Sequence, residues 1–282
     1  MITNLGKVHI KRFLAGWEPD LARSIAFGVG DSNEVATQDR LDYEIGRTDI
    51  SLITYNYIED KLVFKGVMDE TFDGVIYEVA LYSSEAGPAS TVGSRLLLSF
   101  DSETEFWTQG GLPATYGTTN TRIGNDAMMI SLNASTSATA TYSDIFIDLS
   151  GYTSADTFSF AFHSAWPNVS SIVYRFYTDA LNYYSVTVPG GSIGTGFNIV
   201  NIPVAQAVPT GVPRWSEITK VDVVATANAD GAVLLQMEGV RVEDRDNTDI
   251  GQIMIARTKL ATPFTKVAGT IQEVEFPLGV LI

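Results

Sequence analysis

Apolar and polar residues alternate through the segment 41–82, which predicts successive strands of one antiparallel sheet. In the stretch 75–82, the odd-numbered positions would share one face of a strand and the even-numbered positions the other, because side chains of a strand point to opposite faces in turn. The polar breaks at 58–61 and 69–74 are typical of turns. We therefore predict a β-meander over this segment.

The N-terminal residues follow a helical spacing instead. Thr3 and Asn4 can cap a helix over residues 4–15, and Gly16 stands where a left-handed residue would end it. The apolar stripe of this helix would consist of Leu5, Val8, Phe13 and Leu14. After the helix, the segment 24–30 is typical of a short apolar strand that ends in glycines.

The middle of the chain has the strand spacing of a β-sandwich. Eight segments there show strand patterns, at 127–132, 140–149, 157–163, 172–177, 183–188, 197–203, 218–225 and 233–242. Eight strands over this length are the size of a jelly roll. We therefore predict a mainly all-β chain, in which a β-sandwich jelly roll is inserted into a small β-rich domain with one short helix.

Composition places the domain boundaries. Charged residues thin out after about residue 99, and Lys220 is the only lysine between there and the charged linker at 243–249. The strand patterns at 250–260 and 271–282 are too short to fold alone, so they most simply complete the N-terminal sheet. We predict one domain from residues 1–98 with 247–282, and a second from residues 99–246.

Charge and residue content exclude several classes of function. The net charge of −15 argues against a nucleic-acid partner, because phosphate backbones bind basic surfaces. Without cysteine, the chain has no disulfide, thiolate metal site or cysteine nucleophile. The N-terminus lacks the pattern of a signal peptide and no run of eighteen apolar residues occurs, so we expect neither export nor membrane insertion.

The terminal segments carry a resemblance. MITNLGKVHIKRFLAGWEPDLARSIAFGVG, LDYEIGRTDI, FDGVIYEVALYS and ARTKLATPFTKVAGTIQEVEFPLGVLI resemble the terminal segments of structural proteins in the virions of tailed bacteriophages. The resemblance implies a non-enzymatic virion component, made in the host cytoplasm, that assembles with other virion proteins and forms homo-oligomers. It implies a minor tail or fibre-like protein first, and a capsid decoration or head-fibre protein second.

The middle region is similar to jelly-roll modules of carbohydrate-binding and galactose-binding-like families. The residues concerned are Leu98-Ser99-Phe100-Asp101 with Trp107, Arg175-Phe176-Tyr177 with Tyr183-Tyr184-Ser185, and Gly239-Val240-Arg241-Val242-Glu243-Asp244. This similarity implies binding of host surface glycans and a closing strand beside the opening one. It also implies a structural calcium ion held by Asp101 and Asp244, against the alternative of a plain acidic surface; no other cofactor is expected.

Aromatic residues are the best candidates for binding. Exposed Tyr and Trp stack on sugar rings and anchor protein interfaces, although sandwich cores also bury them routinely. We name Trp166, Tyr177, Tyr184 and Trp107 as candidates, with Trp166 expected in a loop beside Pro167. A free-standing glycan-binding module is therefore a further alternative.

Catalysis has weaker signals. His9 and His163 are the only histidines, and no G-x-S-x-G nucleophile elbow is present. The glycine-rich stretch 190–196 precedes a strand pattern rather than a helix, which favours a plain loop over a phosphate cradle. Asp101, Glu103 and Glu105 before Trp107 could suggest a glycosidase, but nothing marks one carboxyl as an acid. We assign no catalytic residue.

Overall fold

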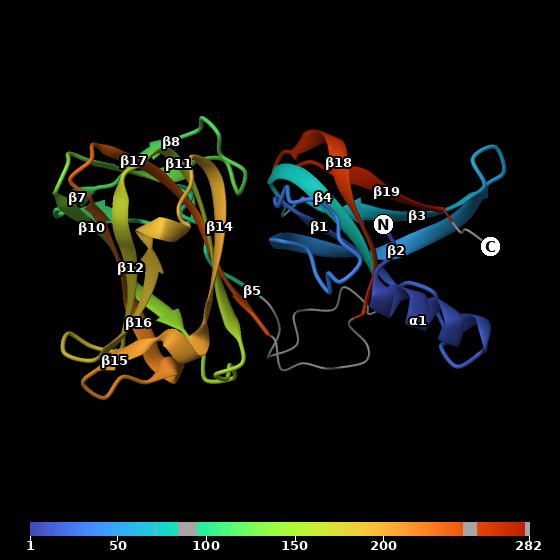
Figure 1. Ribbon diagram of the computed structural model, residues 1–282, viewed down its shortest axis with the longest axis horizontal. Helices are drawn as coiled ribbons and strands as arrows, with labels where there is room; N and C mark the ends of the chain where they lie inside the picture. Colours follow the sequence, from blue (N-terminus) through green and yellow to red (C-terminus); the bar gives the residue numbers. More distant parts are fainter. Residues whose placement is uncertain (71, 84–94, 245–252, 280–282) are drawn as a thin grey trace. The chain divides into compact units, whose positions relative to one another are not determined.

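The computed structural model describes residues 1–70, 72–83, 95–244 and 253–279, and the chain divides into two compact units (Figure 1). The first unit joins Met1–Pro88 to Thr248–Ile282, and the second is Ala89–Asn247. Both are built of strands, with one α-helix in the first unit, so the predicted mainly β class is confirmed. The charged linker predicted at 243–249 lies mostly outside the described residues.

The first unit is a six-stranded antiparallel sheet in the order β18-β4-β1-β2-β3-β19. Its strands are β1 (Ser24–Gly28), β2 (Glu44–Asn56), β3 (Lys61–Met68), β4 (Gly74–Tyr82), β18 (Met254–Lys266) and β19 (Gln272–Gly279). The two C-terminal strands form the two ends of this order, so residues from both ends of the sequence build one sheet. Its core holds Phe27, Phe64, Ile76 and Phe276 among other apolar side chains.

The predicted meander is wrong at its last strand. β2 and β3 are neighbours, but β4 pairs with β1 and β18, while β3 takes β19 on its other side. The second half of β4 is buried at every position from Glu78 to Tyr82, whichever face the side chain is on. A strand buried in this way lies inside a sheet, and alternation along the sequence does not say which strands flank it.

Helix α1 (Asn4–Leu14) begins where the sequence predicts and packs on β18. The Thr3 hydroxyl accepts the N–H of Gly6 at 2.8 Å, and the Thr3 N–H donates to the carbonyl of Ile255 at 3.0 Å. A Cβ at Gly6 would lie 2.0 Å from that carbonyl oxygen, so only glycine permits this approach. The face in contact is therefore not the predicted stripe: Leu5, Val8 and Leu14 are exposed.

A charged cluster is buried beside this sheet. Arg257 of β18 donates from Nε to Glu78 of β4 at 2.8 Å and from Nη2 to Asp42 at 2.8 Å. Glu78 also accepts the backbone N–H groups of Gly30, Asp42 and Tyr43. Arg257 and Glu78 are both buried, so the pair ties β18, β4 and the segment before β2 together in a place that water does not reach.

The second unit is a jelly-roll sandwich of two antiparallel sheets. One, which we term the β12 sheet, has the order β15-β13-β12-β16-β10-β6-β7; the other, the β11 sheet, has the order β14-β11-β17-β9-β8, with β5 also paired to β17. The β12 sheet comprises β6 (Thr108–Gln109), β7 (Leu112–Pro113), β10 (Ser137–Ile147), β12 (Val169–Tyr177), β13 (Tyr183–Pro189), β15 (Val208–Thr210) and β16 (Ile218–Ala227). The β11 sheet comprises β5 (Arg95–Leu98), β8 (Thr115–Gly117), β9 (Ala127–Leu132), β11 (Thr157–Pro167), β14 (Gly196–Pro203) and β17 (Val233–Glu243). Short 3₁₀ turns lie at η1 (Gly190–Ser192), η2 (Val204–Gln206) and η3 (Trp215–Glu217).

All eight strands predicted in the middle of the chain are present. The core between the sheets is aromatic: Phe160 of β11 stacks on Tyr174 of β12 with ring centroids 4.2 Å apart, and Phe158 stacks on Phe176 at 5.4 Å. Because these residues point inward, their neighbours along each strand point outward. The outer sheet faces are therefore where this unit meets its surroundings. Among the described residues, no helix has both the length and the apolar character to span a membrane.

Candidate functional site

The outer face of the β12 sheet carries a connected set of polar and aromatic side chains. In β16, Val221 and Val223 lie in the core, so Lys220 and Asp222 are on the outer face. The same reasoning applies to the other strands of the sheet. We term this surface the polar sheet face, and its residues are Thr108, Thr141, Ser143, Arg175, Tyr177, Tyr183, Ser185, Lys220 and Asp222.

Strand register arranges these residues in two rows across the sheet. Residues opposite each other on paired strands lie on the same face and touch. The first row runs Thr108, Thr141, Asp222, Arg175 and Ser185 over five strands. The second row runs Ser143, Lys220, Tyr177 and Tyr183 over four.

Asp222 is the centre of the hydrogen bonding. Its Oδ1 accepts the Thr141 hydroxyl at 2.8 Å, and its Oδ2 accepts from the Lys220 ammonium at 3.2 Å. Lys220 also places its Nζ 3.8 Å from the ring centre of Tyr177, an approach that attracts a cation to the ring electrons. These contacts hold a carboxylate, an ammonium and a hydroxyl in fixed positions on the face.

The two tyrosines of the second row complete the cluster. Their ring centroids are 4.8 Å apart, and the Arg175 guanidinium lies 5.6 Å from the ring centre of Tyr183. Burial raises the pKa of the Tyr177 phenol, which also interacts with Arg175 and Asp222. Tyr177 is thus largely covered by its neighbours, whereas Tyr183 keeps part of its ring in contact with solvent.

A hollow of about 350 Å³ lies at the β6 end of this face. Its lining is Phe106, Thr108, Thr141, Tyr142, Ser143 and Asp144. Phe106 is 80% exposed beside it. The hollow therefore combines an uncovered aromatic ring with three hydroxyl groups of Thr and Ser and one carboxylate.

This arrangement suits a ligand with both polar and apolar surfaces. The Ser143 hydroxyl can donate and accept hydrogen bonds, while those of Thr108 and Thr141 donate to the Thr141 carbonyl and to Asp222 and can only accept. The carboxylate can accept two hydrogen bonds, and the exposed ring of Phe106 offers an apolar platform. No group of three or more His, Cys, Asp or Glu side chains with metal-binding geometry occurs in the described part of the chain. This face therefore offers hydrogen-bonding groups beside an exposed aromatic ring.

The structure does not bring the four aromatic candidates from the sequence together. Trp107 is only 2% exposed: it stacks on Phe100 at 4.7 Å and donates its indole N–H to Glu105 at 2.7 Å. Its neighbour Phe106 is the exposed one, because alternate side chains point to opposite sides. Trp107 is therefore too buried to bind a ligand, and Tyr177 lies on the polar sheet face but is covered by other side chains.

Tyr184 and Trp166 lie elsewhere. The Tyr184 ring is stacked flat on Trp215, 3.8 Å between centroids, and its hydroxyl donates to the carbonyl of Pro213, so this ring closes one end of the core. Trp166 is exposed, but it sits within β11 of the other sheet rather than in a loop. Neither reaches the polar sheet face. Lys220 and Asp222 of that face were not predicted as binding residues from the sequence.

The residues near Asp101 do not fit a calcium ion. The two carboxylate oxygens of Asp101 accept the backbone N–H groups of Glu103 at 2.8 Å and Asn125 at 3.0 Å. A hard cation needs several free oxygens, not N–H donors directed at the ligand. Asp101 therefore serves to fix two loops together.

The carboxylates before Trp107 are structural in the same sense. Burial raises the pKa of Glu105, but its oxygens accept the N–H groups of Ser99 and Phe100 and the indole N–H of Trp107. Glu103 is exposed and lies in a turn. A pair of carboxyls facing one substrate is therefore not formed here.

A second polar cluster lies on the outer side of the β11 sheet. Glu238 of β17 is fully buried, and its Oε2 accepts the N–H groups of Arg122 at 2.7 Å and Ile123 at 3.2 Å. Burial raises the pKa of Glu238 to about 7, and burial lowers the pKa of His163. Groups with shifted pKa values can mark an active site. Here the backbone of residues 122–123 covers Glu238, which leaves no access for a substrate.

Glu238 nevertheless gives a pH-dependent prediction. The folded protein holds a proton on this group up to pH 7, while an ordinary Glu loses it at 4.5, so its contribution to stability falls as pH rises between these values. Glu238→Gln should unfold with about the same free energy as the wild type at pH 4.5 and with about 3 kcal/mol more at pH 8. Urea unfolding at both pH values measures this difference.

Glu103→Gln is the matched control, because Glu103 is exposed. It should differ little from the wild type at either pH. If Glu238→Gln were instead less stable than the wild type at pH 8, the ionised carboxylate would be the stabilising form and the argument from burial would be wrong.

No protein-family profile and no curated protein matches this chain. Similar solved structures include the family 11 carbohydrate-binding module of a cellulosomal cellulase of Clostridium thermocellum (11% identity, 55% of this chain and 96% of that chain, TM-score 0.38). A second is the family 11 module of the same organism in complex with a β-1,3-1,4-mixed-linked tetrasaccharide (12% identity, 55% and 97%, TM-score 0.40). A third is the enzymatically active domain of tailspike protein 4 of bacteriophage CBA120 (14% identity, 51% and 21%, TM-score 0.30). At these TM-scores the likenesses carry no argument about what this chain binds.

Proposed function

We propose that this chain is a non-enzymatic binding protein whose jelly-roll unit holds a glycan on the polar sheet face. The observation that carries the proposal is the continuity of this face. Two rows of polar and aromatic side chains lead across the sheet to a hollow with an exposed Phe106. Sugar rings pair an apolar side with many hydroxyls, and this face offers partners for both.

The ligand class follows from charge. The chain carries a net charge of −15, so a polyanionic glycan would be repelled during approach. Lys220 is paired with Asp222, and Arg175 lies against Tyr183, so these two cations are engaged within the face. We therefore assign neutral oligosaccharides to this face rather than sulfated or uronic acid polymers.

Substitution of Phe106 tests the proposal. An aromatic contact contributes about 1 kcal/mol beyond its buried area, so Phe106→Ala should weaken binding about tenfold or more. Tyr183→Ala should weaken binding by a similar factor if the ligand extends over the second row. Titration calorimetry with a panel of neutral and acidic cell-surface oligosaccharides measures both, with the neutral ones expected to bind.

Phe146→Ala is the matched control, since Phe146 is 73% exposed and also belongs to this sheet but does not line the hollow. It should bind as the wild type does, and so should Trp166→Ala on the other sheet. Unchanged affinity of Phe106→Ala and Tyr183→Ala, or loss of binding in Trp166→Ala, would place the site elsewhere. A wild-type chain that binds none of the panel would rule out the glycan proposal.

The setting we propose is the virion of a tailed bacteriophage, made in the host cytoplasm, with the jelly roll facing outward toward host glycans. The likeness of the terminal segments to virion structural proteins supports it. Within the particle, a minor tail or fibre-like protein is the first choice and a capsid decoration or head-fibre protein the alternative. Antibody labelling of purified particles, viewed by electron microscopy, distinguishes a tail location from a capsid location. Particles without label would contradict the virion setting and favour a free-standing glycan-binding module.

A further inference from the structure

Strand β2 is only half covered within the first unit. Its first half pairs with β1 up to Asp49, and its second half pairs with β3 from Ile50 to Asn56. Beyond Asp49, no strand of the described residues lies on the other side of β2. The segment Ser51–Asn56, which we term the free half of β2, is therefore an open sheet edge, and Figure 1 shows β2 and β3 running on together to the turn that joins them.

The free half is exposed on both of its faces. Five consecutive residues from Ser51 to Tyr55 are exposed, whereas a strand packed on a core would bury every second one. Leu52, Ile53 and Tyr55 are among them, and the turn that follows holds Tyr57 at 86% and Ile58 at 96% exposure. Large apolar side chains gathered at an open edge mark a place where another chain adds.

The sequence of this edge lacks the features that normally prevent such pairing. No charged residue, proline or glycine occurs from Ile50 to Ile58, and the segment is rich in Ile, Thr and Tyr, which favour strands. By contrast, the end strand β19 carries Glu273, Glu275 and Pro277. The edge of β18 is bridged by the N-terminus at Ala256, and farther along it carries Lys259 and Pro263. Only the free half of β2 is left both apolar and unprotected among these three edges.

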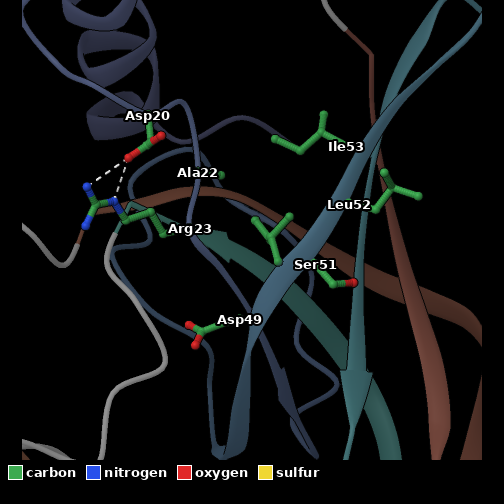
Figure 2. Close-up of a pocket in the computed structure, with 8 residues that line it drawn as sticks. Asp20, Ala22, Arg23, Asp49, Ser51, Leu52 and Ile53 are labelled. Carbon is green, nitrogen blue, oxygen red and sulfur yellow. Dashed lines mark hydrogen bonds and ion pairs between the residues drawn. The ribbon is translucent and has the colours of Figure 1, made fainter.

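A hollow of about 450 Å³ lies beside this edge, where β1 begins. Its lining is Asp20, Ala22, Arg23, Asp49, Ile50, Ser51, Leu52 and Ile53. Figure 2 shows the Asp20–Arg23 ion pair on one side of it and Leu52 and Ile53 on the other. Residues 20–23, which precede β1, lie beside Ile50, whose N–H donates to the Arg23 carbonyl at 2.9 Å, so a strand added along Ser51–Asn56 would begin at this hollow.

We propose that the free half of β2 pairs antiparallel with the free half of β2 in a second copy of this chain. A two-fold pairing places the same segment on both sides, which is the commonest way for identical chains to associate. With the two-fold axis at Ile53, Ile53 of one copy lies opposite Ile53 of the other and Ser51 lies opposite Tyr55, so that opposed residues share a face of the joined sheet.

Charge favours a second copy over other partners at this edge. Each chain carries a net charge of −15, which opposes contact between copies over most surfaces, but the stretch from Ile50 to Ile58 is neutral and brings no like charges together. The exposed area of the five apolar residues is large enough for such a contact. At about 200 Å² for a large side chain, it amounts to roughly 650 Å² per copy, which is the most that they can bury, against about 800 Å² per partner in a standard interface.

The experiment uses the full chain in analytical ultracentrifugation over a range of concentrations. The wild type should dimerise, and Leu52→Lys should weaken the dimer about 100-fold or more, because a two-fold interface contains each substitution twice. Tyr57→Ala should weaken it less, because Tyr57 lies in the turn beside the paired segment and not in it. Ile271→Lys, which changes another exposed apolar residue of the first unit, is the matched control and should dimerise as the wild type does.

Cross-linking provides a second measurement that does not depend on a destabilising change. The chain has no cysteine, so Leu52→Cys, Ile53→Cys and Thr54→Cys, made one at a time, can form a disulfide only between copies. Covalent dimers from these variants but not from Ile271→Cys would support the pairing. A wild type that stays monomeric, a dimer insensitive to Leu52→Lys, or cysteines at the edge that never cross-link would each overturn it. Glycan binding by the second unit is measured separately and does not depend on this outcome.

Discussion

Arg257→Met should destabilise the first unit by about 3–5 kcal/mol, because it leaves the buried carboxylate of Glu78 and the partly buried one of Asp42 without their cation. The methionine fills most of the space, so the loss comes from charge rather than from a cavity. Hydrogen exchange measured by mass spectrometry should show lost protection in peptides that cover β1, β4 and β18. Peptides from β11 and β17 of the jelly roll are the internal reference and should keep theirs.

Two further variants test whether the destabilisation comes from the unpaired buried charge or from loss of the arginine side chain itself. Lys61→Met removes an exposed ion pair with Glu59 and should cost no more than about 1 kcal/mol. The double variant Arg257→Met with Glu78→Met removes both buried charges and should recover much of the loss. If the double variant is as unstable as Arg257→Met alone, the buried carboxylate is not the cause.

Trp107→Ala should cost the jelly-roll unit about 3–5 kcal/mol. The substitution opens a cavity against Phe100 and Tyr142 and removes the indole N–H from the buried carboxylate of Glu105. Urea unfolding followed by far-UV circular dichroism measures the change. Trp107→Phe keeps most of the packing and loses only the N–H, so it should lie between the wild type and Trp107→Ala.

Phe106→Ala is a control from the adjacent position, since Phe106 is exposed. It should change the free energy of unfolding by no more than about 0.5 kcal/mol. Equal destabilisation by Phe106→Ala and Trp107→Ala would contradict the assignment of inner and outer side chains in this segment.

Phe106 and Trp107 show what the sequence alone leaves undetermined. Alternation shows that Phe106 and Trp107 point to opposite sides, but both are aromatic and nothing in the sequence says which side is the core. Trp107 was named as one of the Tyr and Trp residues able to stack on a sugar, and it is the buried member of the pair. The long strands could be predicted from the sequence, because six or more alternating residues indicate a strand whichever face is buried. The segment 183–188, for example, lies in β13. β6, β7 and β8 have only two or three residues each and carry no such signal.

The polar sheet face did leave a signal in the sequence. In the stretch Ile218–Ala227, Lys220 and Asp222 are the only charged residues, and they stand two apart among valines. Such spacing places both on one face of a strand whose other face is apolar. What the sequence does not contain is the register with β10 and β12, which sets Thr141 and Arg175 on either side of Asp222. Register depends on the packing of both sheets, so the site emerges only from the fold.

The division of the first sheet between the two ends of the chain has a consequence for synthesis. β4 ends at Tyr82 and its partner β18 begins at Met254, so about 170 residues are translated between them. At ~5–20 residues per second, that interval lasts roughly 10–30 s. During it the jelly roll can fold as a unit, while β4 lacks the strand that covers one side and Glu78 lacks its guanidinium. In the nascent chain the sheet is therefore incomplete, and Glu78, which is buried in the folded protein, is still hydrated. When β18 arrives, it completes this side of the sheet and Arg257 neutralises the Glu78 carboxylate.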